Sequence, residues 1–435
     1  MDYPELPDFQ YLTEELKALF SLKAEYGAKG LADHAVKAAL SLKNIIEEIR
    51  CIPVDEEQAA TEPNELSAIK GLRPAGPRRL WSHLNPELYK EKLEGSILAR
   101  SAGCTLGAIV EGWKVEDMES WARQIGDPFP PADYWSEARS PESLRYNISR
   151  CDEYTRERMN GVPVDDDLIY TQLGLLLFEK HGLGFTTEDV ARMWDEYLYW
   201  VWIDMQWPLE RFRKGVCAEK AADGNPWQQM ICAFIRCDPY AYVAPGWPQK
   251  AAEFSYRDGL LSHRRNGLYG GMFFAAAIAA AFAVDDPVEA IRIGLTEIPR
   301  ECRLAQEIRW ALDVGRNFRN YRDARRAVDE KMKGMHPVHT INNACLVVLG
   351  LMIGGRDVSR VLSETVAMGL DNDCTAATAG SIVGAVVGKK GIPERWHRRF
   401  YDKMHSYIKG HPVFSISDMV SRYARQAQIV SQRCP

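Results

Sequence analysis

Apolar residues recur at helical spacing along most of the chain, and stretches with the period-2 alternation of strands are nearly absent. This spacing predicts two helices within residues 11–50. Residues 52–79 are polar and rich in proline, which predicts a loop. We therefore expect an N-terminal helical arm with its linker over residues 1–85 and an all-α domain over residues 86–435.

The all-α domain is predicted to be a series of helices. They are Pro86–Leu106, Leu168–His181, Thr187–Trp202, Pro226–Phe234, Gln249–Leu261, Gly271–Ala283, Pro287–Ile298, Arg303–Gly315, Asn320–Gly334, Ile341–Ile353, Val358–Met368 and Cys374–Gly388. Two of them have clear start signals, the acidic turn after Thr186 and the sequence Asp285-Asp286-Pro287. The segments contain no repeat of fixed period.

Composition limits the classes of partner and compartment. The formal net charge is −6 and basic residues occur in no run longer than a pair, so nucleic acid or an anionic membrane is not expected as the main partner. The ten cysteines form no C-x-x-C pair and are expected to be mostly reduced core thiols. The N-terminus has no secretory pattern, and the longest apolar run, Met272–Val284, is too short to span a bilayer, which predicts a cytoplasmic protein.

Two groups of carboxylates stand directly before long apolar helices. The first, Asp165–Asp167, precedes Leu168–Leu177, and the second, Asp371–Asp373, precedes Cys374–Gly388. Helices that are apolar on nearly all sides lie in the core of a large protein. Both groups are therefore expected at the start of a buried helix.

Two interpretations of these carboxylates are open. Asp is favoured at helix N-caps, where it interacts well with the helix dipole. Several carboxylates crowded at the start of a buried helix, however, repel one another and are costly to desolvate. A bound cation would remove both costs. Since the candidate ligands are oxygens, without a cluster of His or Cys, they favour Mg²⁺, Mn²⁺ or Ca²⁺ over Zn²⁺.

Two predicted helices carry several glycines, which leave part of the helix surface without side chains. Gly380, Gly384 and Gly388 recur every four residues, which lets another helix approach closely and favours close packing of the metal-bearing helices. The segment 95–111 has three further glycines and ends in a single acid, Glu111. A single acid in this position, taken on its own, is more often a solvated residue at a helix end.

Three motifs follow one another along the chain. Gly-x-x-x-Ala-x-Ser-Ala-Gly-x-x-Leu-Gly-x-x-x-Glu begins at Gly95, the acidic triplet begins at Asp165, and Asp-Asn-Asp-Cys begins at Asp371. With them, residues 93–400 resemble the ADP-ribosylglycohydrolase family, which includes the dinitrogenase reductase-activating glycohydrolase and the crystallin J1 proteins. The resemblance implies a compact orthogonal helical bundle of ADP-ribosylglycohydrolase type, to which the N-terminal helical arm is added.

The resemblance also implies roles for single residues. The family's Thr-Asp-Asp metal motif falls on residues 165–167, and its Asp-Thr-Asp-Thr motif falls on residues 371–374. Cys374 replaces the last threonine, so either Cys374 or Thr375 would contact the metal, and Cys104 stands where the family usually has Asp. The implied ligands of two Mg²⁺ ions, with Mn²⁺ as the alternative, are Asp165, Asp166, Asp167, Asp371 and Asp373, and the implied catalytic residues are Glu111 and Asp166. The triplet and Asn147-Ile148-Ser149 are similar to a divergent Asp-Asp-Asp branch of the family.

Other segments are expected near the substrate. The loop 261–271 resembles the family's substrate loop, which implies contacts from His263, Asn266, Gly267 and Tyr269, although a lone histidine is more often a satisfied core residue. His336 and His339 could bind a metal or cap the helix that follows. The aromatic segment 194–207 would form a core or pocket wall, or stack on a nucleobase.

The function implied by the resemblance is a Mg²⁺-dependent hydrolase that cleaves the bond at the anomeric carbon of a ribose. Its substrate would be an ADP-ribosyl or related ribosyl compound, either small or linked to a protein. The alternatives are a nucleosidase, a hydrolase of another N- or O-glycoside in a small-molecule pathway, and a non-catalytic, crystallin-like binding protein. Retention of the five aspartates argues against the last of these.

Overall fold

The computed structural model describes residues 3–433 and divides the chain into two units, residues 1–59 and 60–435. The first unit consists mainly of two helices, α1 (Phe9–Glu25) and α2 (Leu31–Arg50). Gly27 and Gly30, in the turn between them, have positive φ angles of 74° and 79°. The helices predicted within residues 11–50 are therefore present.

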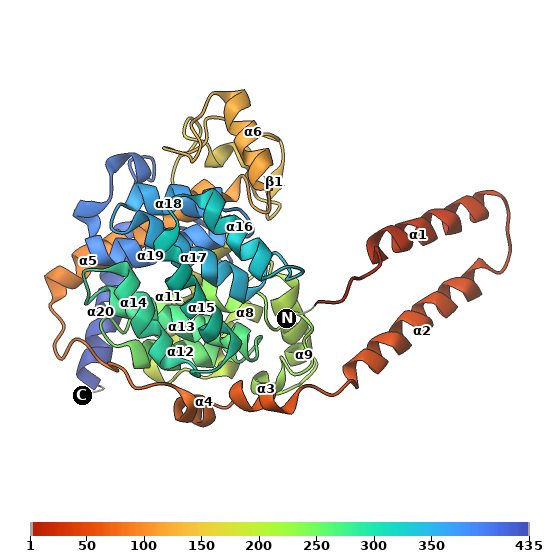
Figure 1. Cartoon of the computed structure of the whole chain (residues 1–435), viewed down its shortest axis with the longest axis horizontal. Helices are drawn as coiled ribbons and strands as arrows, with labels where there is room; N and C mark the ends of the chain where they lie inside the picture. The colour runs from red at the N-terminus through yellow and green to blue at the C-terminus, as the bar shows by residue number, and fades with distance from the viewer. Residues whose placement is uncertain (1–2, 434–435) are drawn as a thin grey trace. The chain divides into compact units, whose positions relative to one another are not determined.

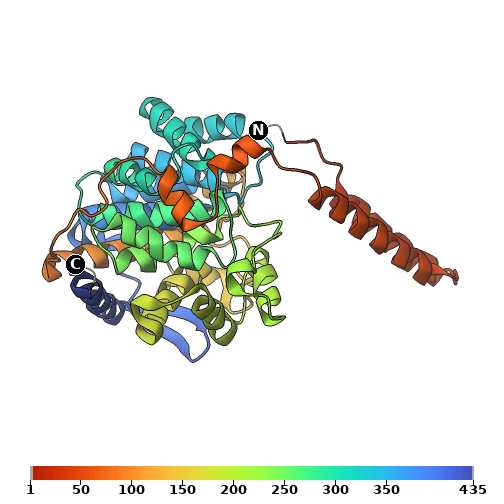
Figure 2. The ribbon, with the colours of Figure 1, turned by 90° about the horizontal axis from the view of Figure 1, so that it is seen from below.

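The second unit is built almost entirely of helices (Figures 1 and 2). After α3 (Glu56–Thr61), which contains the boundary, they are α4 (Leu66–Leu72), α5 (Pro86–Ala108), α6 (Val115–Ile125), α7 (Asp166–His181), α8 (Thr187–Tyr197), α9 (Ile203–Arg213), α10 (Cys232–Ile235), α11 (Asp238–Tyr242), α12 (Pro248–Gly259), α13 (Asn266–Ala281), α14 (Pro287–Gly294), α15 (Arg303–Val314), α16 (Tyr321–Lys331), α17 (Thr340–Gly354), α18 (Val358–Ala367), α19 (Asn372–Val387) and α20 (Ile416–Arg433). The prediction of an all-α fold is confirmed.

Two short antiparallel hairpins interrupt this pattern, β1 (Leu144–Arg145) with β2 (Ser149–Arg150) and β3 (Lys403–Ile408) with β4 (His411–Ser415). In the described part of the chain, no helix has the length and apolar character needed to cross a membrane. The cysteines within residues 3–433 are free thiols and most are buried, whereas Cys434 lies outside the described residues.

Several boundaries differ from the prediction. The helix expected over 187–202 ends at Tyr197, because Leu198 is extended, and α9 begins separately at Ile203. The helix expected over 226–234 is reduced to the single turn α10, since Met230 forms a β-bridge with His339 instead. These breaks are imposed by contacts distant in sequence.

The segment expected to be a loop contains the helices α3 and α4. From residue 60 onwards it packs on the second unit. Arg73 and Arg78 pair with the buried Glu297, and Asn64 accepts a 2.8 Å hydrogen bond from the backbone N–H of Arg265. By its contacts, residues 60–85 thus belong with the helical body rather than with α1 and α2.

Four helices, α5, α13, α17 and α19, form the buried centre of the second unit, and every residue of α13 is buried. The glycine face of α19 packs against α5. A Cβ at Gly380 would lie 2.3 Å from the carbonyl oxygen of Ala99, and one at Gly103 would lie 2.2 Å from that of Ala376. The partner of this face is therefore α5, whereas the sequence favoured packing between the two metal-bearing helices.

We predict that Gly380→Ala destabilises the protein by about 1–3 kcal/mol or more, because its methyl group would meet the backbone of α5, which cannot give way locally. Gly71→Ala in α4 is the control, since a Cβ there has nothing within 4 Å in the described structure. It should be neutral or stabilising by up to about 1 kcal/mol. Chemical denaturation measures both changes, and equal stabilities would contradict the close packing.

Candidate active site

The two acidic clusters meet where α7 and α19 begin. Asp165 is the N-cap of α7, and one of its oxygens accepts a 3.1 Å hydrogen bond from the backbone N–H of Asp167. Asp371 occupies the N-cap of α19 but makes no side-chain capping bond. One carboxylate oxygen of Asp167, one of Asp373 and the sulfur of Cys374 lie within 4.8 Å of one another. N-capping therefore accounts for Asp165 only in part and not for Asp371.

Glu111 joins this cluster from the far end of α5. A Cβ on Gly107, four residues earlier, would lie 2.4 Å from the backbone nitrogen of Asp373, so the end of α5 touches the start of α19. Carboxylate oxygens of Glu111, Asp371 and Asp373 lie within 4.8 Å of one another. Residues far apart in the sequence thus share one site.

Burial raises the pKa values of the carboxylates in the cluster. Desolvation, followed by repulsion from neighbouring carboxylates, raises the pKa values of Asp166 and Asp371 well above their usual range. Desolvation also raises the pKa of Asp373, although the Arg145 guanidinium opposes the rise. Desolvation and the charge of Asp373 raise the pKa of Glu111 to about 7, against the opposing effect of Arg145. Without further positive charge, the cluster is electrostatically costly.

The donor set fits a divalent cation. Among residues 3–433, no hydrogen-bond partner exists for Asp166 Oδ2, Asp167 Oδ2 or Asp371 Oδ1, and all three oxygens are buried. Buried polar atoms normally have a partner. Hard oxygen donors of this kind suit Mg²⁺, Mn²⁺ or Ca²⁺.

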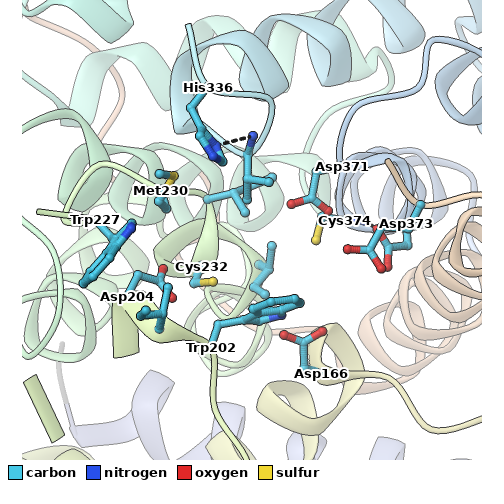
Figure 3. A pocket seen from close by; sticks show the side chains of 15 residues that line it. Asp166, Trp202, Asp204, Trp227, Met230, Cys232, His336, Asp371, Asp373 and Cys374 are labelled. Carbon is cyan, nitrogen blue, oxygen red and sulfur yellow. Dashed lines mark hydrogen bonds between the residues drawn. The ribbon is translucent and has the colours of Figure 1, made fainter. Parts of the chain in front are cut away.

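The cluster forms one side of a pocket (Figure 3). Glu111, Asp166, Asp371, Asp373 and Cys374 line the acidic side. Most of the remaining lining is apolar and aromatic and consists of Trp202, Ile203, Trp227, Met230, Ile231, Ile235 and Val338. Asp204, Cys232 and His336 complete the lining. Cys374 lines the pocket, whereas the hydroxyl of Thr375 donates to the carbonyl oxygen of Asn372 at 3.5 Å.

The sequence profile of the ADP-ribosylglycohydrolase family matches residues 85–427. The chain belongs to this family. A solved chain described as "ADP-ribosylglycohydrolase-related protein complex" superposes with a TM-score of 0.50 and 16% identity, over 79% of this chain and 99% of the other. At that identity the similarity shows the fold alone. A comparison with curated proteins gives no match.

Membership makes the protein a hydrolase of ADP-ribosylglycohydrolase type, with glycosyl hydrolase activity as its general chemistry. The family depends on divalent metal ions, and the buried Asp and Cys groups of this site could hold them. The family match includes every carboxylate of the pocket, from Glu111 to Asp373.

The loop predicted to contact the substrate does not line this pocket in the described structure. His263, Asn266, Gly267 and Tyr269 are not among the described residues that line the pocket. Asn266 donates to Glu62 at 2.9 Å and to Gln229 at 3.0 Å, and the hydroxyl of Tyr269 donates to the carbonyl oxygen of Pro63. A Cβ on Gly267 would lie 2.2 Å from the carbonyl oxygen of Gln228. The start of α13 is therefore covered by segments that the sequence pattern did not place there.

His263 is a buried histidine behind the pocket wall. Its Nε2 lies 3.3 Å from Asp204 Oδ2, and Asp204 itself lines the pocket. Burial lowers the pKa of His263, although the hydrogen bond with Asp204 opposes this shift. His263 could therefore orient Asp204, but it does not reach the pocket.

The two histidines before α17 accept hydrogen bonds from backbone N–H groups. His339 Nδ1 accepts a 3.1 Å hydrogen bond from the N–H of Ile341 and thereby caps α17. His336 Nδ1 accepts a 3.1 Å hydrogen bond from the N–H of Val338, and the residue lines the pocket. The capping interpretation therefore accounts for His339.

Two site residues were not found from the sequence, Arg145 and Tyr146. Both lie in the β1–β2 hairpin, directly before the Asn147-Ile148-Ser149 segment. Arg145 bonds Glu111, Asp165 and Asp373, and the hydroxyl of Tyr146 donates to Asp166 Oδ1 at 2.7 Å. An arginine in a polar loop carries no signal of burial, so only the fold shows its position.

Arg100 supports the cluster from inside α5. Its guanidinium, 1% exposed, donates to the carbonyl oxygen of Asp167 at 2.8 Å and pairs with Asp238 at 2.9 Å. Burial of this pair is tolerated because each charge has a partner.

We predict that Arg100→Met destabilises the protein by about 3–5 kcal/mol, because it leaves Asp167 and Asp238 buried without their cation. Arg398→Met, at an exposed position, should change the stability by less than about 0.5 kcal/mol. Urea denaturation at neutral pH compares the two. Similar losses for both variants would contradict the role assigned to Arg100.

Proposed function

We propose that the protein is a Mg²⁺-dependent glycoside hydrolase that cleaves the bond at the anomeric carbon of a ribose in an ADP-ribosyl or related ribosyl substrate. The observation that carries the proposal is the position of the acidic cluster. Carboxylates with unpartnered, buried oxygens line a pocket together with apolar and aromatic side chains. Such a pocket suits a ligand with a polyhydroxylated part and a flat, less polar part.

Asp167 and Asp371 would hold the metal, since each has an oxygen without a partner among the described residues and each belongs to a group of donors within 4.8 Å of one another. Asp166 also has such an oxygen but lies outside these groups. In the metal-free site, burial raises the pKa of the Cys374 thiol well above its usual value, and its sulfur is a softer donor than the carboxylate oxygens. A bound divalent cation would offset the negative charge, orient the substrate and make water a better nucleophile. Oxygen ligands favour Mg²⁺, with Mn²⁺ as the alternative.

Glu111 is the proposed acid/base residue. Its side chain is 32% exposed and lines the pocket beside Asp371 and Asp373, where a carboxylate can accept a proton from water, and in the metal-free site its pKa is raised to about 7. In hydrolysis, the water oxygen bonds to the anomeric carbon while Glu111 accepts a water proton. The bond to the leaving atom breaks, and that atom receives a proton. Asp166, on the same side of the pocket, would help to orient the reacting groups.

The aromatic side of the pocket would bind the remainder of the substrate. Trp202 comes from the aromatic segment predicted to form a pocket wall, and with Trp227 it offers flat surfaces for a base or another ring. Trp194 instead lies in the core, with Arg236 4.8 Å from its ring centre.

One observation favours a nucleoside as a second candidate substrate. Among the described residues that line the pocket there is no Lys or Arg to neutralise a diphosphate. A metal-dependent activity screen over ADP-ribosyl-arginine, ADP-ribosyl-serine, ADP-ribose and nucleosides separates the two candidates. Absence of hydrolysis of all of them with Mg²⁺ or Mn²⁺ present would contradict the proposed function.

We predict that Mg²⁺ raises the melting temperature of the wild type by mass action, and that Asp371→Asn gains far less. The amide replaces a carboxylate oxygen that has no partner in residues 3–433, so its loss should weaken metal binding without breaking an ion pair. Without metal, the variant should be as stable as the wild type or more stable, because repulsion with Asp373 is reduced.

Asp286→Asn is the matched control for this substitution. Asp286 is an exposed N-cap that accepts a hydrogen bond from the backbone N–H of Val288. An asparagine at this position can accept the same hydrogen bond. Its Mg²⁺-dependent gain should equal that of the wild type. An equal gain for Asp371→Asn, measured by differential scanning calorimetry, would remove Asp371 from the metal site.

We predict that Glu111→Gln lowers turnover on the order of 10² or more, while the Mg²⁺-dependent stabilisation largely persists. The substitution keeps the size and hydrogen bonding of the side chain but removes the base. Glu116→Gln, in the exposed first turn of α6, should leave turnover unchanged. Steady-state kinetics on the best substrate of the screen tests this, and wild-type turnover in Glu111→Gln would remove its acid/base role.

A further inference from the structure

A guanidinium group lies between the two acidic motifs. Arg145 Nη2 donates hydrogen bonds of 3.0 Å to Asp165 Oδ2 and of 3.0 Å to Asp373 Oδ2, and so links the start of α7 to the start of α19. Arg145 Nη1 bonds Glu111 Oε2 at 2.9 Å. One positive group thus bridges three carboxylates that come from three segments of the chain, which is the task of a bridging metal ion.

Arg145 is fixed in this position by its surroundings. Its side chain is 13% exposed, and Nη1 also donates to the carbonyl oxygen of Ala108 at 2.5 Å. The next residue, Tyr146, bonds Asp166 and lies against the rings of Trp200 and Tyr407, with centroid distances of 5.0 and 5.8 Å. These contacts make Arg145 a part of the core of the site rather than a mobile surface side chain.

The hairpin backbone supports the same conclusion. Tyr146 and Asn147 have positive φ angles of 53° and 58°. A tyrosine in this region is strained and persists only where its surroundings hold it. The hydrogen bond of Tyr146 to Asp166 and its ring contact with Trp200 keep it in this conformation. The hairpin is therefore built to present Arg145 and Tyr146 to the carboxylates.

Arg145 satisfies only part of the cluster. The oxygens of Asp166, Asp167 and Asp371 that lack a partner within the described chain are not among its contacts. A single guanidinium carries one positive charge, whereas Glu111 and the five aspartates carry six carboxylates between them. The cluster retains donors and negative charge for a divalent ion, but the position between Asp165 and Asp373 is already taken.

We propose that Arg145 is a built-in cation that takes the place of one of two divalent ions, so that the site binds a single divalent cation through the remaining carboxylates, Asp167 and Asp371 among them. This inference rests on the proposed metal site and specifies its stoichiometry. It replaces the two ions implied by the sequence resemblance with one metal ion and one guanidinium. In this arrangement Arg145 is a positioning residue that holds Glu111, Asp165 and Asp373 in their mutual geometry.

The test is the number of Mn²⁺ ions that the metal-free, full-length protein binds, measured by isothermal titration calorimetry and by electron paramagnetic resonance. The wild type should bind one ion and show no signal of a coupled Mn²⁺ pair. Arg145→Gln should bind two and show the coupled signal, because it frees the oxygens of Asp165 and Asp373. Arg145→Lys, which keeps a cation, should bind one.

Arg150→Gln is the matched control, since Arg150 lies in the same hairpin but pairs with Glu142 and Asp152 instead. It should bind one ion. Two ions in the wild type, or one in a folded Arg145→Gln, would overturn the inference while the proposed metal dependence stands. Absence of binding in all variants would overturn both. The wild-type stoichiometry decides the question even if Arg145→Gln does not fold.

Discussion

The close contact between α5 and α19 determines where the chemistry of this protein can lie. Backbone meets backbone at Gly103 and Gly380, and Ser96 of α5 bonds Ser381 of α19. Because helices in such contact cannot shift past one another without a clash, the end of α5 is fixed against the start of α19. Glu111 follows that end and Asp373 stands at that start, so this packing brings the proposed acid/base residue beside the proposed metal site, where Arg145 pairs with both residues.

This rigid frame carries an electrostatic cost. Six carboxylates converge, and desolvation raises the pKa of each of them. Two arginines offset part of the cost from opposite directions. Arg100 reaches Asp167 from within α5, and Arg145 reaches Asp165 and Asp373 from the hairpin. Asp166 and Asp371, which have oxygens without a partner among the described residues, line the pocket. A divalent cation and the hydroxyls of a substrate would interact with them there.

The sequence predicted the parts of the fold that depend on local pattern. The long apolar helices and the acidic starts of α7 and α19 are visible as periodicity and as charge in an unusual place. The α8 boundary and the reduced α10 could not be predicted, since Tyr197 accepts a hydrogen bond from the N–H of Lys409 and Met230 bridges to His339. Proximity of Glu111 to the aspartates was predictable only from the glycines of α5 and the family motif together.

The absence of the predicted substrate loop from the described pocket lining and the failure to predict Arg145 have the same physical cause. Asn266 and Tyr269 are polar and lie beside a conspicuous helix start, but Glu62 and Pro63 from a distant segment satisfy them. Arg145 stands in a plain polar loop, yet three acids surround it. In both cases the role of the residue depends on a partner that is distant in the sequence. The sequence pattern around the residue does not identify that partner. The resemblance gives Thr where this chain has Asp165, and Arg145 bonds that added carboxylate. The aspartate that departs from the motif and the partly buried arginine thus form one ion pair, which is the physical reason to expect a different metal count in this chain.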